Sequence, residues 1–227
     1  MASKLLIILL FVLPLAFNPQ NTNYNVTKLS FLLFCSSIFA VNWAITRYKS
    51  KSIEVSFSGA VPVVIAFVFA GLISLSGATF YPAVIKAIVL VCVWGIISET
   101  VRTLLTSDRK LVLYSMAMVY AGAIAAVYGH LQSVKILKSI PKGYWSHLEI
   151  SSFGNINYMS GYMAVIMPLS ILICMKVTGW KRVLNIAVLL FIVVSLVLFK
   201  TIGALAGLLV AIPIISISIL ISRKVSS

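Results

Sequence analysis

The residues best suited to polar chemistry lie in one turn and at two isolated lysines of an otherwise apolar chain. The stretch Ser152–Tyr162 reads SFGNINYMSGY and leads directly into an apolar segment. Its Asn155 and Asn157 are of the type favoured at helix N-termini, where unpaired N–H groups and a partial positive charge attract anions. Lys200 stands between two apolar runs, and Lys86 lies near the end of another. These four are the candidate substrate-binding residues, and a lipid phosphate or diphosphate would suit the helix entrance together with Lys200.

Each of these residues also has a simpler interpretation. The two asparagines can cap the helix that follows them, with or without a ligand. Lys86 can extend its long side chain to the lipid headgroups. Ionisable residues at membrane depth are otherwise functional candidates by default, and the position of Lys200 in a tight helical hairpin favours a function.

The sequence lacks the residues that several kinds of chemistry require. The chain has no GxxxxGK[ST] phosphate loop, which argues against ATP-driven transport. Its two histidines, His130 and His147, are far apart, and no Cys/His cluster has zinc-like spacing; we expect neither a metal nor a cofactor. Of the four acidic residues only one is predicted on the same face as the turn, so neither a carboxylate pair nor a Ser-His-Asp set can form there. No catalytic residue is assigned. The acidic residues are Glu54, Glu99, Asp108 and Glu149.

The composition defines the elements that must position these residues. Of 227 residues, 61% are hydrophobic and 10% are charged, and apolar runs long enough to cross a bilayer recur along the chain. The runs are continuous rather than alternating, which favours helices over strands. We predict an all-α, polytopic transmembrane bundle, a single domain over 1–227. The expected spans number about eight: Lys4–Phe17, Lys28–Thr46, Ser58–Ser76, Pro82–Leu105, Lys110–Gly129, Tyr158–Val177, Val183–Phe199 and Ile202–Ile221.

The first span is short and contains Pro14, so it also resembles a secretory signal peptide. No small-x-small cleavage site follows it, and we expect the helix to be retained.

Two further patterns predict packing within the bundle. Ala117, Ala121, Ala125 and Gly129 form a small-residue stripe for close helix approach, with a dimer interface as the alternative. Glu99 and Arg102, three residues apart, form the pattern of a structural ion pair.

Basic residues predict the orientation. Twelve of the 18 lysines and arginines fall in alternate loops, and such residues in short loops are retained on the cytoplasmic side. Both termini are therefore expected in the cytoplasm and the Phe153–Asn157 turn outside. This sorting accounts for most of the +14 charge without a nucleic-acid partner; the lipid bilayer is the expected surrounding. The six basic residues assigned to the outer side are Lys28, Lys86, Lys135, Lys138, Lys142 and Lys200.

Two motifs resemble those of a known family. Phe153–Ala164, continuing to Met167–Leu169, reads FGNINYMSGYMA…MPL and resembles the FGNPN-x-x-A/G-x-Y-L-A…PL signature of the O-antigen ligase and polymerase family. One helix later, Lys200–Leu209 reads KTIGALAGLL and resembles the family's T-x-S-R-G-A-L-L-G-L-L element. The similarity covers about Ser151–Ala211 and is diffuse before it.

The resemblance implies a metal-independent, multi-pass glycosyltransferase of the bacterial inner (cytoplasmic) membrane. Such enzymes act in polysaccharide and lipopolysaccharide biosynthesis. They move glycan from undecaprenyl diphosphate to a glycan or lipid A-core acceptor, or to a protein, at the periplasmic face. In the family, arginines are thought to hold the diphosphate, and a histidine in a large periplasmic loop serves the acceptor.

This chain departs from the family pattern. Ile156 replaces the proline of FGNPN, and Ile202 replaces the arginine of the second element. Lys200 could supply charge there, but without the planar fork of arginine. The large loop and the C-terminal helices of the family do not follow, so we expect a truncated or N-terminal portion, an enzyme only as part of a complete protein. The alternatives are a non-catalytic membrane accessory protein and a transporter or flippase component for lipid-linked sugars.

Overall fold

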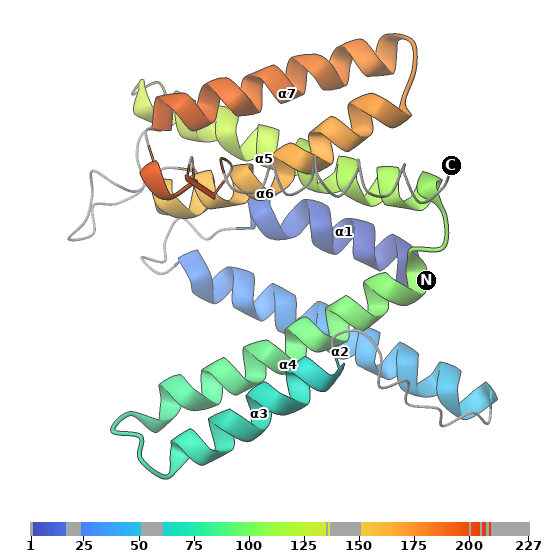
Figure 1. The fold of residues 1–227 in the computed structure, drawn as a ribbon, viewed down its shortest axis with the longest axis vertical. Helices are drawn as coiled ribbons and strands as arrows, with labels where there is room; N and C mark the ends of the chain where they lie inside the picture. The colour runs from blue at the N-terminus through green and yellow to red at the C-terminus, as the bar shows by residue number, and fades with distance from the viewer. Residues whose placement is uncertain are drawn as a thin grey trace. The chain divides into compact units, whose positions relative to one another are not determined.

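The computed structural model describes residues 2–16, 24–50, 61–134, 136, 151–199, 201–204, 206, 207 and 209. Within these ranges the regular structure is helical, without strands, and Figure 1 labels seven helices. Their bounds are α1 Ala2–Leu15, α2 Tyr24–Ser50, α3 Val61–Leu75, α4 Tyr81–Leu104, α5 Asp108–Ser133, α6 Ile156–Lys176 and α7 Trp180–Phe199.

The first seven predicted spans each coincide with a helix, but several helices extend beyond the predicted limits. α2 begins before Lys28 and continues past Thr46, and α5 runs on to Ser133. Hydropathy detects the apolar part of a helix, whereas backbone hydrogen bonding continues into its polar ends. The fifth helix therefore continues about one turn beyond the predicted limit at Gly129. Of the eighth span, Ile202–Ala204 is helical and most of the remainder lies outside the described residues.

Four of the described helices, α4 to α7, are long and apolar enough to cross a membrane. α1 and α3 are apolar but shorter, and α2 contains the shorter apolar stretch Thr27–Asn42. The all-helical fold and these four helices are those of a helical membrane protein.

The described residues form two compact units, which we treat separately. Unit 1 comprises Met1–Leu9 and Leu29–Lys110, and unit 2 comprises Leu10–Lys28 and Leu111–Ser227. In unit 1, α3 and α4 form a helical hairpin joined at residues 76–80 (Figure 1). The predicted ion pair of α4 is confirmed: Nη2 of Arg102 lies 2.6 Å from Oε1 of Glu99, and Nε lies 2.8 Å from Oε2.

Unit 2 holds the main hydrophobic core. α6 and α7 pack against each other after a short turn at residues 177–179 (Figure 1). The core joins Val119 and Ala125 of α5 to Met163 of α6 and Leu196 of α7, and Leu15 of α1 packs at its edge. The small-residue stripe of α5 is buried in the single chain, so the prediction of packing within the molecule is confirmed. Its members are Ala117, Ala121, Ala125 and Gly129.

Candidate functional site

The candidate site is a tight turn, Ser151–Asn155, which we call the FGN turn, at the start of α6. Ser151 and Gly154 both have positive φ angles, 69° and 65°, and the Gly154 N–H donates to the Ser151 carbonyl (3.2 Å). Asn155 is extended, and its Oδ1 accepts from the backbone N–H of Asn157 at 2.8 Å. The capping role predicted for Asn155 is thus confirmed. The Asn157 side chain is exposed in the first turn of the helix.

Ser151 attaches the FGN turn to α5. Its backbone N–H donates to Oε1 of Gln132 (2.7 Å), and its Oγ donates to the carbonyl of Ala125 (2.6 Å). Ser151 is only 1% exposed. A non-glycine residue in the left-handed region is costly, so these two buried hydrogen bonds are what holds the backbone in this conformation.

Ser152 and Phe153 attach the same turn to the end of α1 and the start of α2. The Ser152 Oγ donates to the carbonyl of Pro14 (2.6 Å). Nζ of Lys28 donates to that same carbonyl (2.8 Å) and to the carbonyl of Leu13 (3.3 Å), and it lies 4.3 Å from the centre of the Phe153 ring. Sequence reasoning counted Lys28 only among the outer charges, because no local pattern connects it to the turn.

Aromatic packing continues from the turn into the bundle. The Phe153 ring lies 5.2 Å from that of Tyr162, one of the residues of the FGN motif, at a tilted angle. The Tyr162 hydroxyl donates to the carbonyl of Met118 in α5 (3.0 Å). The aromatic residues at both ends of the motif therefore fix the approach of the turn to α5.

His130 occupies the same end of unit 2, in the last turns of α5. Its Nε2 lies 2.8 Å from Oγ of Ser195 in α7. Its ring stacks on Phe199 at 4.7 Å and meets Phe191 edge-on at 5.8 Å. Ser195 is fully buried, so this pair does not form an accessible nucleophile. Among the described residues no group of three His, Cys, Asp or Glu side chains could hold a metal ion.

The structure places the four predicted substrate-binding residues in different parts of the chain, and one of them is not described. Asn155 and Asn157 lie together at the FGN turn. Lys86 is exposed in the second turn of α4, as expected, but belongs to unit 1, and its role stays a prediction. Lys200 lies outside the described residues. Its neighbour Thr201 is buried, and the Thr201 hydroxyl has no hydrogen-bond partner among the described residues.

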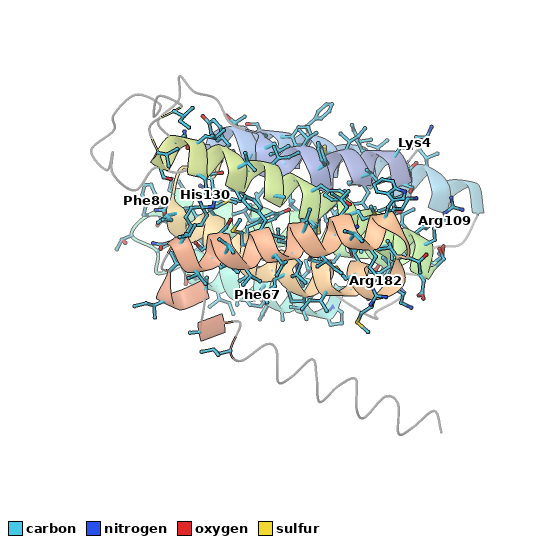
Figure 2. All side chains as sticks on the ribbon, turned by 90° about the horizontal axis from the view of Figure 1, so that it is seen from above. Lys4, Phe67, Phe80, Arg109, His130 and Arg182 are labelled. Atoms are coloured by element: carbon cyan, nitrogen blue, oxygen red, sulfur yellow. The ribbon has the colours of Figure 1, made fainter. Side chains whose placement is uncertain are left out.

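In unit 2, three of the four described basic residues lie at the end opposite the FGN turn. The FGN turn, His130 and the C-terminus of α7 lie at one end, because α6 begins where α5 and α7 finish. Lys176, Lys181 and Arg182 lie at the other end, where α6 turns into α7. Figure 2 shows His130 and Arg182 at these opposite ends. The separation matches the predicted sorting of loops, while the side of the membrane that each end faces stays a prediction.

The chain matches no known protein-family profile, no curated protein and no solved structure.

Proposed function

We propose that this protein is an O-antigen ligase- or polymerase-like membrane glycosyltransferase, acting on an undecaprenyl-diphosphate-linked glycan at the outer face of the bacterial inner membrane. The proposed topology has eight spans with both termini in the cytoplasm, and the acceptor is a glycan or lipid A-core. The proposal extends the resemblance of the Phe153–Ala164 and Lys200–Leu209 stretches to that family.

The observation that carries the proposal is the construction of the FGN turn. The stretch that resembles the family signature is held by side-chain hydrogen bonds at one end of the apolar bundle. It leads directly into the capped N-terminus of α6. Unpaired N–H groups and the helix dipole at such a terminus favour an anion. A diphosphate at the headgroup level would leave its prenyl chain among the apolar helices.

The charge distribution supports the proposed orientation. Lys176, Lys181 and Arg182 occupy the end of unit 2 opposite the FGN turn. Short loops that carry lysine and arginine are retained in the cytoplasm, which would direct the turn outward, where lipid-linked glycans are transferred in the family it resembles.

We assign binding roles rather than a catalytic role. Asn155 and Asn157 would donate or accept hydrogen bonds at the phosphate and sugar, and Lys200 would supply a charge-assisted contact to phosphate oxygens. Lys86 is a further proposed cation at the outer side. Ile202 is 84% exposed at the position of the family arginine, so an arginine there would meet no steric obstacle from the described residues.

The proposal is tested by binding of an undecaprenyl diphosphate sugar to the purified protein in nanodiscs. Lys200→Ala should weaken binding by about tenfold, the loss of one charge-assisted contact. Lys181→Ala is the matched control, because Lys181 is exposed at the opposite end and should bind like the wild type. Ile202→Arg should tighten binding. Absence of binding by the wild type would refute the proposal.

A non-catalytic accessory protein is the second candidate. It is favoured by Ile202 in place of an arginine and by the absence of any Asp or Glu among the described residues of unit 2. An accessory protein would bind the lipid-linked glycan without turnover, and so would a portion of a transferase that is active only within a complete protein. The coding sequence beyond Ser227 separates the two candidates, because an open frame that encodes a periplasmic loop with histidine and arginine would support the transferase. The flippase alternative would require cations along a path through the bundle, whereas the described part of unit 2 buries no lysine or arginine.

A further inference from the structure

The side chain of Lys28 joins three separate segments of unit 2. α1 ends at Leu15, so the carbonyls of its last turn lack partners further along the helix. The ammonium of Lys28 donates to two of them, Leu13 and Pro14. A cation is favourable there because the C-terminus of a helix carries a partial negative charge.

The same ammonium also contacts the FGN turn. It lies over the face of the Phe153 ring at 4.3 Å, within the range of a cation–π interaction. The Pro14 carbonyl that it binds is shared with the Ser152 hydroxyl. Two consecutive residues of the turn are thereby held by one lysine and one carbonyl.

No carboxylate contacts Lys28 among the described residues. Its described contacts are the two carbonyls and the aromatic face. Phe153 lies two residues before the helix cap Asn155, so the contact of Lys28 with its ring is close to the start of α6. Lys28 itself is half-buried.

We propose that Lys28 is a positioning residue: it fixes the FGN turn against the end of α1, so that the first turn of α6 is preorganised for the phosphate of the lipid-linked substrate. The part of this inference that concerns substrate rests on the proposed function. The part that concerns the turn does not.

The test compares Lys28→Met, which keeps the length of the side chain but removes its donors, with Lys28→Arg, which keeps the charge and the affinity for an aromatic face. Amide hydrogen exchange is measured over residues 151–157 in detergent. Lys28→Met should accelerate exchange there by about tenfold, with exchange in α7 unchanged. Lys28→Arg should restore slow exchange. Equal exchange in the wild type and Lys28→Met would overturn the proposal.

Substrate binding is measured on the same proteins with undecaprenyl diphosphate sugar in nanodiscs. We expect about tenfold weaker binding for Lys28→Met and recovery in Lys28→Arg, whereas a purely structural support would change exchange without changing affinity. If the wild type binds no lipid, the proposed function fails and the exchange data still decide the positioning role. Should Lys28→Met not fold, Lys28→Gln keeps a hydrogen-bond donor but removes the positive charge over the Phe153 ring; it should accelerate exchange by about two- to fivefold, and no acceleration would overturn the proposal.

Discussion

The α3–α4 hairpin of unit 1 and the α5–α7 bundle of unit 2 are both strongly apolar, yet they differ in what they bury. α3 has no buried residue and α4 has one, Val93. α5, α6 and α7 each bury five or more, many of them small or polar. In a membrane, lipid covers apolar side chains as well as protein does, so apolar character alone does not produce a packed core.

Buried polar side chains mark the difference more clearly. Of the ten in the described residues, only Ser36 belongs to unit 1. In unit 2, Asn185 illustrates how they specify the packing: its Oδ1 accepts from the Tyr120 hydroxyl (3.2 Å) and its Nδ2 donates to the Lys181 carbonyl (2.7 Å). Close approach of small residues and hydrogen bonds of buried side chains such as Asn185 thus build the unit that contains the FGN turn.

The largest expected effect concerns helix approach in unit 2. A side chain at Gly122 in α5 would collide with Ile166 and Tyr162 of α6. Gly122→Leu should lower the free energy of unfolding by about 3 kcal/mol through overpacking, measured by chemical denaturation in micelles. Gly161→Leu is the control, because nothing lies within 4 Å of a Cβ added there. Equal losses for the two variants would contradict the packing described for α5 and α6.

Removing one polar contact of the FGN turn should have the next largest effect. Gln132→Met leaves the buried N–H of Ser151 without its acceptor, which should destabilise unit 2 by about 2 kcal/mol. Ser133→Ala, at the neighbouring exposed position, should change stability by less than about 0.5 kcal/mol. The same denaturation assay measures both, and a neutral Gln132→Met would show that the turn is not anchored to α5.

The helix cap should contribute less. Asn155→Ala removes the acceptor for the Asn157 N–H and should cost about 1 kcal/mol, the usual value of an N-cap side chain. Asn157→Ala, whose side chain is exposed, should be close to neutral in stability but should weaken binding of the lipid-linked sugar. If Asn157→Ala lowered stability more than Asn155→Ala, then Asn157 and not Asn155 would be the capping residue.

The smallest effect is expected in unit 1. Phe69 of α3 is 65% exposed, and detergent or lipid covers it in the folded protein. Phe69→Ala should therefore change the free energy of unfolding by less than about 0.5 kcal/mol in micelles. A loss above about 1 kcal/mol would show that the outer face of α3 packs against protein, and the contrast between the two units would be lost.

Local patterns predicted the elements well. Continuous apolar runs located seven helices, Asn155 was expected as a cap, and Glu99–Arg102 as an ion pair. Each of these depends on residues within a few positions of each other, which periodicity and capping rules capture. The helix ends were less accurate, since polar residues such as His130 continue a helix beyond its apolar part.

The contacts that assemble the candidate site were not predictable in this way. Ser152 and Pro14 are 138 residues apart, and His130 and Ser195 are 65 apart. Only the packing of the helices brings them together. Lys28 was therefore treated as one loop charge among six, although it contacts the FGN turn directly.

The central claim is that the FGN turn faces outward and binds a lipid-linked diphosphate. It is tested most directly by labelling Asn157→Cys, in a variant whose three native cysteines are serines, with a membrane-impermeant maleimide on spheroplasts, where the outer face of the inner membrane is accessible. We predict labelling without permeabilisation, slowed by added undecaprenyl diphosphate sugar. Labelling only after permeabilisation would contradict it.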